Sequence, residues 1–305
     1  MSLSSSAEPA PISAALSEFQ PEWVAVVVVL LIDAGWARRI GFSLSISPLD
    51  AEVLLIMFGP AVALRALLPQ SRAALSAEFF AVSVGATTAF GILSYLCCAV
   101  AMPLVDERLL QLDRALGFDW LHWFRFVTAH PAAASVLHYS YNSLVYQGLY
   151  AAIFFGLMGR KERVRELFWI IFLAGLLTSA GSVFFPALGA FDAFRMPQLS
   201  DYIPAMEQLR AGIDLHFDLG QLTGVVTFPS FHTTMALVYA WGFRRTGAVG
   251  HLVLVLNTLM VLATPFYGGH YLVDMIAGAA VAVVSVAGVR FLLARRLGQN
   301  LRAAA

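Results

Sequence analysis

Long apolar segments alternate with short polar connectors along most of the chain. Eight stretches approach the roughly 20 apolar residues that a helix needs to cross the hydrocarbon core of a bilayer. They cover about residues 22–40, 51–69, 78–104, 132–158, 163–187, 228–244, 248–267 and 270–294. Because backbone polar groups in lipid must be bonded within their own segment, helices are expected here and not strands. The pattern predicts an all-α fold, a polytopic transmembrane helix bundle.

Two connectors are longer than simple turns. Residues 105–131 mix leucine and tryptophan with aspartate and arginine at helical spacing, which predicts a helix lying along the membrane interface. Residues 188–227 form the longest polar stretch, and a loop of that length in a compact domain is usually functional. We therefore expect a flexible tail at 1–21, two N-terminal transmembrane helices within 22–70, and a membrane domain at 78–297 that contains both connectors.

The composition agrees with a membrane protein. Hydrophobic residues make up 59% of the chain and charged residues 12%, whereas a soluble domain has about 25% charged residues. The formal net charge is +0, which gives no reason to expect a nucleic-acid partner. Cys97 and Cys98 are adjacent within an apolar run, so they are interpreted as small membrane-core residues. The first twenty residues lack the basic start and apolar core of a signal peptide.

Basic residues indicate the orientation. They gather in the connector 159–166, at Arg244–Arg245 and between residues 290 and 302, all on one side if the segments alternate. Cytoplasmic connectors carry an excess of lysine and arginine, so this side is predicted to be cytoplasmic. The 188–227 stretch then faces outward. We expect an integral protein of an inner or plasma membrane with an active site facing away from the cytoplasm. Arg38–Arg39 does not fit eight alternating spans, which leaves the N-terminal topology open.

Two short stretches carry polar residues that packing does not explain, FPSFHTT at 228–234 and YGGHYLVD at 267–274. His270 and Asp274 are four residues apart, so on a helix they share one face. The carboxylate can hold one ring nitrogen and leave the other free as a nucleophile or base. Gly269 has no side chain, so a ligand can approach the backbone there.

Both stretches lie at the predicted starts of helices. Helix N-termini carry unpaired N–H groups and a partial positive charge, which suit a phosphate. Pro229 can begin a helix, Ser230 offers a hydroxyl beside the open amides, and His232 lies within the same turn. Two such helix starts, with two imidazoles and a carboxylate, predict a phosphoryl-transfer site.

These stretches resemble the motifs of a known family. FPSFHT resembles the second motif, Pro-Ser-x-His, of the type 2 phosphatidic acid phosphatase superfamily, and GGHYLVDMIAG resembles its third motif, His-x-x-x-Asp. The resemblance covers roughly residues 78–295 and implies a six-helix phosphatase-type core after about two N-terminal helices. It further implies that His270 takes the phosphoryl group, Asp274 orients it, His232 protonates the leaving oxygen and Ser230 helps to cradle the phosphate. The implied partners are a lipid phosphate and membrane lipids, with no cofactor and no metal.

The chain departs from the phosphatase pattern in its cations. The first motif, Lys-x6-Arg-Pro, is missing, since the only lysine is Lys161, and Thr264 stands where the family has an arginine before the third motif. The pattern is more similar to the inositol phosphorylceramide synthase branch, which FFPALGAF at 184–191 also resembles. That branch passes a headgroup to the hydroxyl of a second lipid. Another cation must then balance the phosphate, and Arg210 is the first candidate and Arg195 the second.

Several alternatives stay open from the sequence. Tyr271 either contacts the phosphate or anchors the chain at the interface. His138 and Gln147 either line a headgroup cavity or join helices. Two histidines and a carboxylate are also able to hold a divalent metal in a hydrolase. A lipid transporter or lipid-binding protein is the alternative that is not an enzyme, although the chain lacks the internal symmetry common in transporters.

Overall fold

The fold is described by a computed structural model that covers residues 19–303, with side chains placed through Arg295. Each of the eight predicted stretches contains a helix, so the predicted all-α bundle is confirmed. The predicted tail at 1–21 lies outside the described residues except for its last three, and α1 already begins at Gln20.

The elements follow one another in this order. They are α1 (Gln20–Ile40), β1 (Ser43–Ser45), α2 (Pro48–Leu67), α3 (Arg72–Cys98), α4 (Asp106–Ala115), α5 (Trp120–Ala129), α6 (Pro131–Asn142), α7 (Leu144–Leu157), α8 (Lys161–Phe184), α9 (Ala190–Ala193), η2 (Pro197–Leu199), α10 (Ile203–Ala211), β2 (His216–Asp218), η3 (Leu219–Gln221), α11 (Phe231–Phe243), α12 (Ala248–Tyr267) and α13 (Leu272–Ala303).

Four of the helices are long and apolar enough to cross a membrane. They are α3, α8, α12 and the part of α13 up to Arg295, and α7 is a shorter apolar helix. The protein is therefore an integral membrane protein. Many large apolar side chains on the outside of the bundle are exposed, such as Ile56, Val145 and Leu252, because lipid and not water surrounds this surface.

Three predicted elements are divided. The predicted interfacial helix at 105–131 is in fact two helices, α4 and α5. The break follows Gly117, whose φ of 78° ends α4, and Asp119, whose side chain accepts the His122 N–H at 2.9 Å to start α5. The predicted helix at 132–158 is divided at Ser143 into α6 and α7. The 188–227 stretch is not a plain loop, since it holds α9, α10 and β2.

Two contacts fix the direction of α1. Near its start, the buried carboxylate of Glu22 accepts Arg165 Nε at 3.0 Å and Trp169 Nε1 at 2.9 Å, both from α8. After its end, β1 pairs in parallel with β2, with Ser43 opposite His216. The helix therefore begins beside the first turns of α8 and ends beside the 188–227 stretch. Arg38–Arg39 lies at that second end, and α1 and α2 form a hairpin.

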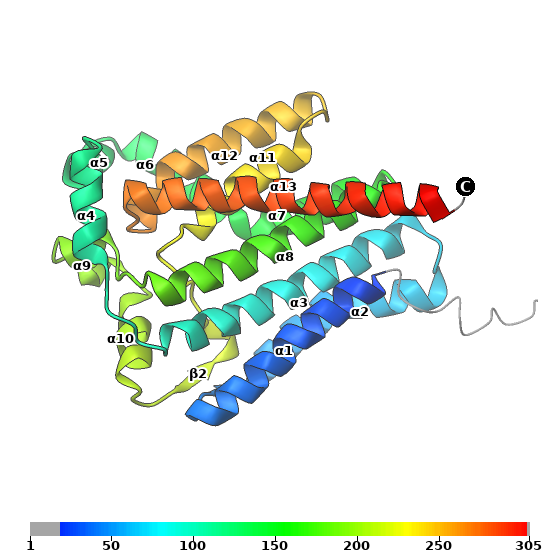
Figure 1. Ribbon diagram of the computed structural model, residues 1–305, viewed down its shortest axis with the longest axis horizontal. Helices are drawn as coiled ribbons and strands as arrows, with labels where there is room; N and C mark the ends of the chain where they lie inside the picture. Colours follow the sequence, from blue (N-terminus) through cyan, green and yellow to red (C-terminus); the bar gives the residue numbers. More distant parts are fainter. Residues whose placement is uncertain (1–18, 304–305) are drawn as a thin grey trace, which may run out of the picture.

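The three basic clusters meet at one end of the bundle. Arg163 Nη2 donates to the Gly242 carbonyl at 2.7 Å, and Arg290 Nε lies 3.9 Å from Glu166 Oε1. The C-terminus of α13 is at this end, and α4, α5, α9 and α10 lie at the opposite end (Figure 1). We call these the basic end and the capped end. That the basic end is cytoplasmic stays a prediction.

The helices pack around one large apolar core. Its buried side chains come from α1, α3, α7, α8, α11 and α13, among them Phe79, Phe155 and Phe168. A polar pair joins α7 to α12, since Asn257 Nδ2 donates to Gln147 Oε1 at 3.0 Å and both side chains are buried. Of the two interpretations of Gln147, a contact between helices is the one that the structure shows. His138 is exposed on α6.

Candidate active site

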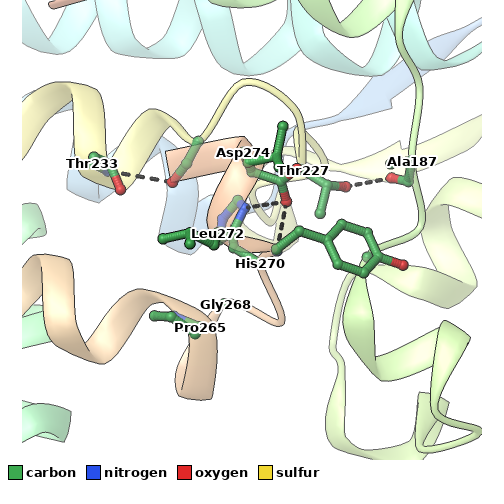
Figure 2. A network of polar contacts seen from close by, with 12 residues as sticks. Ala187, Thr227, Thr233, Pro265, Gly268, His270, Leu272 and Asp274 are labelled. Carbon is green, nitrogen blue, oxygen red and sulfur yellow. Dashed lines mark hydrogen bonds and ion pairs between the residues drawn. The ribbon is translucent and has the colours of Figure 1, made fainter. Parts of the chain in front are cut away.

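The turn between α12 and α13 holds His270 at the capped end. His270 Nδ1 lies 3.3 Å from Asp274 Oδ2, and the same carboxylate oxygen accepts the Tyr271 N–H at 2.8 Å (Figure 2). His270 is 4% exposed and Asp274 is fully buried. Because the carboxylate can only accept, the proton of a neutral imidazole lies on Nδ1 and the lone pair on Nε2. The spacing of four residues thus gives the contact that the sequence predicts.

The start of α11 is joined directly to α13. Ser230 caps α11, with its Oγ accepting the Thr233 N–H at 3.3 Å, and its own N–H donates to the Asp274 carbonyl at 3.0 Å. Thr234 Oγ1 donates to the Gly278 carbonyl at 2.9 Å. Ser230 is fully buried. The two motifs, some forty residues apart in sequence, are therefore held together by backbone contacts.

His232 lies in the first turn of α11 and stacks on Tyr141 of α6, with ring centroids 4.0 Å apart and planes inclined by 9°. A Cβ atom at Gly268 would lie 2.5 Å from His270 Cδ2 and 2.8 Å from Tyr141 Oη, so Tyr141 also borders the turn that carries His270. The structure brings His232, His270 and Asp274 into one site.

Residues 107–288 match the PAP2 superfamily, a match that includes both motifs and every helix from α5 to α12. The chain belongs to the PAP2 superfamily. Members are generally phosphatases that act on lipid phosphates, so membership supports phosphatase-type chemistry on a lipid phosphate. No curated protein and no solved structure matches the chain. The α1–α2 hairpin lies outside the PAP2 match.

Two carboxylates of α4 support the PAP2 site, and the sequence interpretation did not include them. Asp113 Oδ2 accepts the Leu272 N–H at 2.9 Å and Asp113 Oδ1 accepts the Val273 N–H at 3.0 Å. Asp106 accepts the N–H groups of Leu188 at 3.0 Å and Gly189 at 2.7 Å. Asp106 and Asp113 are seven residues apart, so they share one helix face. This spacing is the sequence feature from which a shared role of the two carboxylates could have been predicted.

Burial raises the pKa of Asp106 above its ordinary value, while the amides of Leu188 and Gly189 act in the opposite direction. Burial likewise raises the pKa of Asp113, and its two amide donors oppose that rise. Both carboxyl groups accept two N–H donors each, which a carboxylate does best. The two aspartates therefore cap the turns that build the site.

These bonds change one expectation. The amides at the start of α13 were expected to be open to a phosphate, but Tyr271 donates to Asp274 and Leu272 and Val273 donate to Asp113. For α13 that expectation is wrong, because the chain's own carboxylates occupy these donors. The start of α11 is only partly occupied, through the bond from Thr233 to Ser230.

The two glycines of the turn have packing roles. Gly269 has a φ of 61°, and a Cβ atom there would lie 2.5 Å from the ring of Phe191. The Gly269 carbonyl accepts the Ala190 N–H at 2.6 Å, so α9 rests directly on the turn. Tyr271 is fully buried and its hydroxyl donates to Asp106 Oδ1 at 3.1 Å, so the interpretation as an interface anchor is wrong. Phosphate contacts by Gly269 and Tyr271 stay predictions.

Both candidate cations belong to segments of the capped end, Arg195 after α9 and Arg210 in α10 (Figure 1). Arg210 of α10 donates from Nη2 to the Met102 carbonyl at 2.9 Å, which ties it to the end of α3. Arg195 is exposed and follows α9, the helix that rests on the Gly269 turn. Within residues 19–303, no three His, Cys, Asp or Glu side chains are arranged to hold a metal ion.

Proposed function

We propose that the protein transfers the phosphoryl group of a lipid phosphate through a phosphohistidine on His270. The contact between His270 Nδ1 and Asp274 Oδ2 carries the proposal, because it leaves Nε2 as the free nucleophile. His232 is the second imidazole at the site, and among residues 19–303 no carboxylate is bonded to its ring. It is therefore suited to give and take a proton.

The reaction has two steps. In the first, His270 Nε2 attacks phosphorus, the bond from phosphorus to the lipid oxygen breaks, and His232 gives that oxygen a proton. In the second, the hydroxyl of an acceptor attacks the phosphohistidine, the bond from phosphorus to nitrogen breaks, and His232 takes the proton of the hydroxyl. Asp274 holds the proton on His270 Nδ1 and balances the charge of the ring while the phosphoryl group is attached.

We further propose that the acceptor is a lipid hydroxyl, which makes the enzyme a headgroup phosphotransferase. The support is the missing cations of the phosphatase pattern. Thr264 is fully buried and its hydroxyl donates to the Met260 carbonyl at 2.8 Å, so it has no free polar group for a phosphate. Of the two candidate cations, Arg210 is the first, since its Nη2 is bonded to the Met102 carbonyl while its buried Nη1 has no hydrogen-bond partner among residues 19–303, and Arg195 is the second.

The test uses purified full-length protein in detergent with a panel of lipid phosphates and a lipid alcohol, in the presence of a chelator. We expect turnover that vanadate inhibits. His270→Ala is expected to lose at least about a thousandfold in kcat, because the nucleophile itself is removed. His251→Ala is the matched control, since His251 is an exposed histidine at the basic end of α12 and is expected to leave kcat unchanged.

The products separate the subtypes. A headgroup found on the lipid alcohol supports transfer, and free phosphate alone contradicts it while leaving the phosphohistidine in place. Loss of turnover on chelation that metal restores contradicts the phosphohistidine and supports a metal-dependent hydrolase. Turnover that survives in His270→Ala contradicts the role of His270. Movement of lipid across vesicles without any turnover supports a transporter.

A further inference from the structure

The carboxylate of Asp113 is bonded immediately beside the nucleophile. Asp113 is fully buried, and its two oxygens accept the N–H groups of Leu272 and Val273, the second and third residues after His270. Tyr271, the residue directly after His270, donates its N–H to Asp274. Three consecutive amides after His270 are thus held by two carboxylates that come from different helices.

This arrangement restrains the direction of the imidazole. The backbone of His270 leads into a helix start whose amides cannot shift without breaking bonds to Asp113. A buried N–H group that loses its acceptor is destabilising, so the bonded position is strongly preferred. The partial positive charge at the start of α13 also faces the Asp113 carboxylate, which stabilises that helix end.

The helix that carries Asp113 is itself fixed. Asp106, on the same face of α4, accepts the amides of Leu188 and Gly189 and the hydroxyl of Tyr271. Gly189 has a φ of 92°, and a Cβ atom there would lie 2.7 Å from the Gly269 carbonyl oxygen. The α4 helix is thus tied on one side to the 188–189 turn and on the other to α13. Support of this kind keeps a reacting group in place.

We infer that Asp113 is a positioning residue for His270: it holds the first turn of α13 so that Nε2 faces the incoming phosphorus. The inference rests on the proposed role of His270 as nucleophile. It adds a residue from a helix that the sequence interpretation assigned to the membrane interface, at a distance of 159 residues along the chain from Leu272.

The test compares Asp113→Asn with Asp119→Asn in the full-length protein. Asparagine keeps the size of aspartate but has one acceptor oxygen, and its NH2 group meets an N–H that needs an acceptor. We expect kcat to fall by about 10–100-fold with KM within about twofold, as for other residues that orient a reacting group. Asp119 is the matched control, since it also caps a helix start but accepts only the His122 N–H of α5.

A third variant covers the case in which Asp113→Asn does not fold. Asp113→Glu keeps the charge and both acceptor oxygens, and we expect it to retain more of kcat than the asparagine variant and to lose about tenfold against wild type. Each kcat is measured well below the melting temperature of the variant, so that a loss of stability alone does not change it.

The outcomes are distinct. A folded Asp113→Asn variant with wild-type kcat overturns the positioning role, and so does an equal loss in Asp119→Asn. A wild-type kcat in Asp113→Glu, when the asparagine variant does not fold, overturns it as well. Turnover that survives in His270→Ala contradicts the proposed function itself. The results for the Asp113 variants test only the positioning role and leave the proposed function in place. A fall in kcat that is confined to the Asp113 variants supports the inference.

Discussion

The two motif helices approach closely at Gly278 of α13, and replacing this glycine by alanine is the sharpest test of the site. A Cβ atom at Gly278 would lie 2.4 Å from the carbonyl oxygen of Ser230 and 3.2 Å from Thr234 Oγ1. The Ser230 carbonyl belongs to the backbone and accepts the Thr234 N–H at 3.1 Å, so it cannot rotate away as a flexible side chain would. The start of α11 must therefore move.

The size of the movement follows from the distance. An ordinary carbon–oxygen contact is about 3.3 Å, so the helices must separate by about 0.9 Å at this point. His232 follows Ser230 by two residues and moves with it, whereas His270 and Asp274 stay with α13. A misplacement of about 1 Å between reacting groups costs about 100-fold in rate, or about 2.7 kcal/mol. Overpacking also destabilises a folded protein by about 1–3 kcal/mol.

The assay is kcat/KM of Gly278→Ala for the lipid phosphate that wild type turns over, together with a thermal melt. Gly288→Ala is the matched control on the same helix, because a Cβ atom there would meet Leu173 Cδ2 at an ordinary 3.5 Å. We expect about a 100-fold loss in the first variant and no loss in the second, which gains helix propensity. Full activity in a folded Gly278→Ala protein would refute the coupling of the two motifs through this contact.

Three further predictions concern buried polar groups. Glu22→Ala removes the acceptor of Arg165 Nε and Trp169 Nε1 and should lower stability by about 1–3 kcal/mol without changing kcat below the melting temperature, and an unchanged melt would contradict this. Asp33→Asn should raise the melting temperature. The carboxylate of Asp33 is buried, and within residues 19–303 neither of its oxygens has a hydrogen-bond partner, so removing its charge removes a cost of burial. A lower melting temperature would show that a partner exists. Tyr202→Phe removes a hydroxyl whose oxygen lies 3.1 Å from the Leu188 carbonyl and 3.3 Å from the Gly268 carbonyl and which donates to one of them at a time. We expect kcat to fall about fivefold, and an unchanged kcat would mean that this hydroxyl does not hold the turn.

Much of the fold was open to prediction from the sequence. The apolar segments gave every long helix, and the predicted range of α12, 248–267, is the observed one. The contact between His270 and Asp274 was also predicted, because residues four apart can meet locally, although His270 lies in the turn before α13 and not on the helix as predicted. The capping role of Ser230 is local as well, since its hydroxyl bonds three residues ahead.

The predictions failed where residues that end a helix, or side chains that form hydrogen bonds, override the periodic spacing of apolar residues. The 105–131 stretch has helical periodicity throughout, but Gly117 and the cap at Asp119 divide it. Its aspartates were interpreted as the polar face of an interfacial helix, whereas Asp113 is buried against α13. Periodicity shows which residues share a face, and it does not show what that face meets.

The sequence by itself thus determined a polytopic helical protein with a His-x-x-x-Asp pair and a second histidine, since apolar length and helical spacing act over a few turns. Only the tertiary structure decided that Tyr141 stacks on His232, that Asp113 holds the start of α13, and that the α1–α2 hairpin attaches to the 188–227 stretch. These contacts join residues about 90 to 170 positions apart, and such pairs are selected by how whole helices pack and not by any local preference.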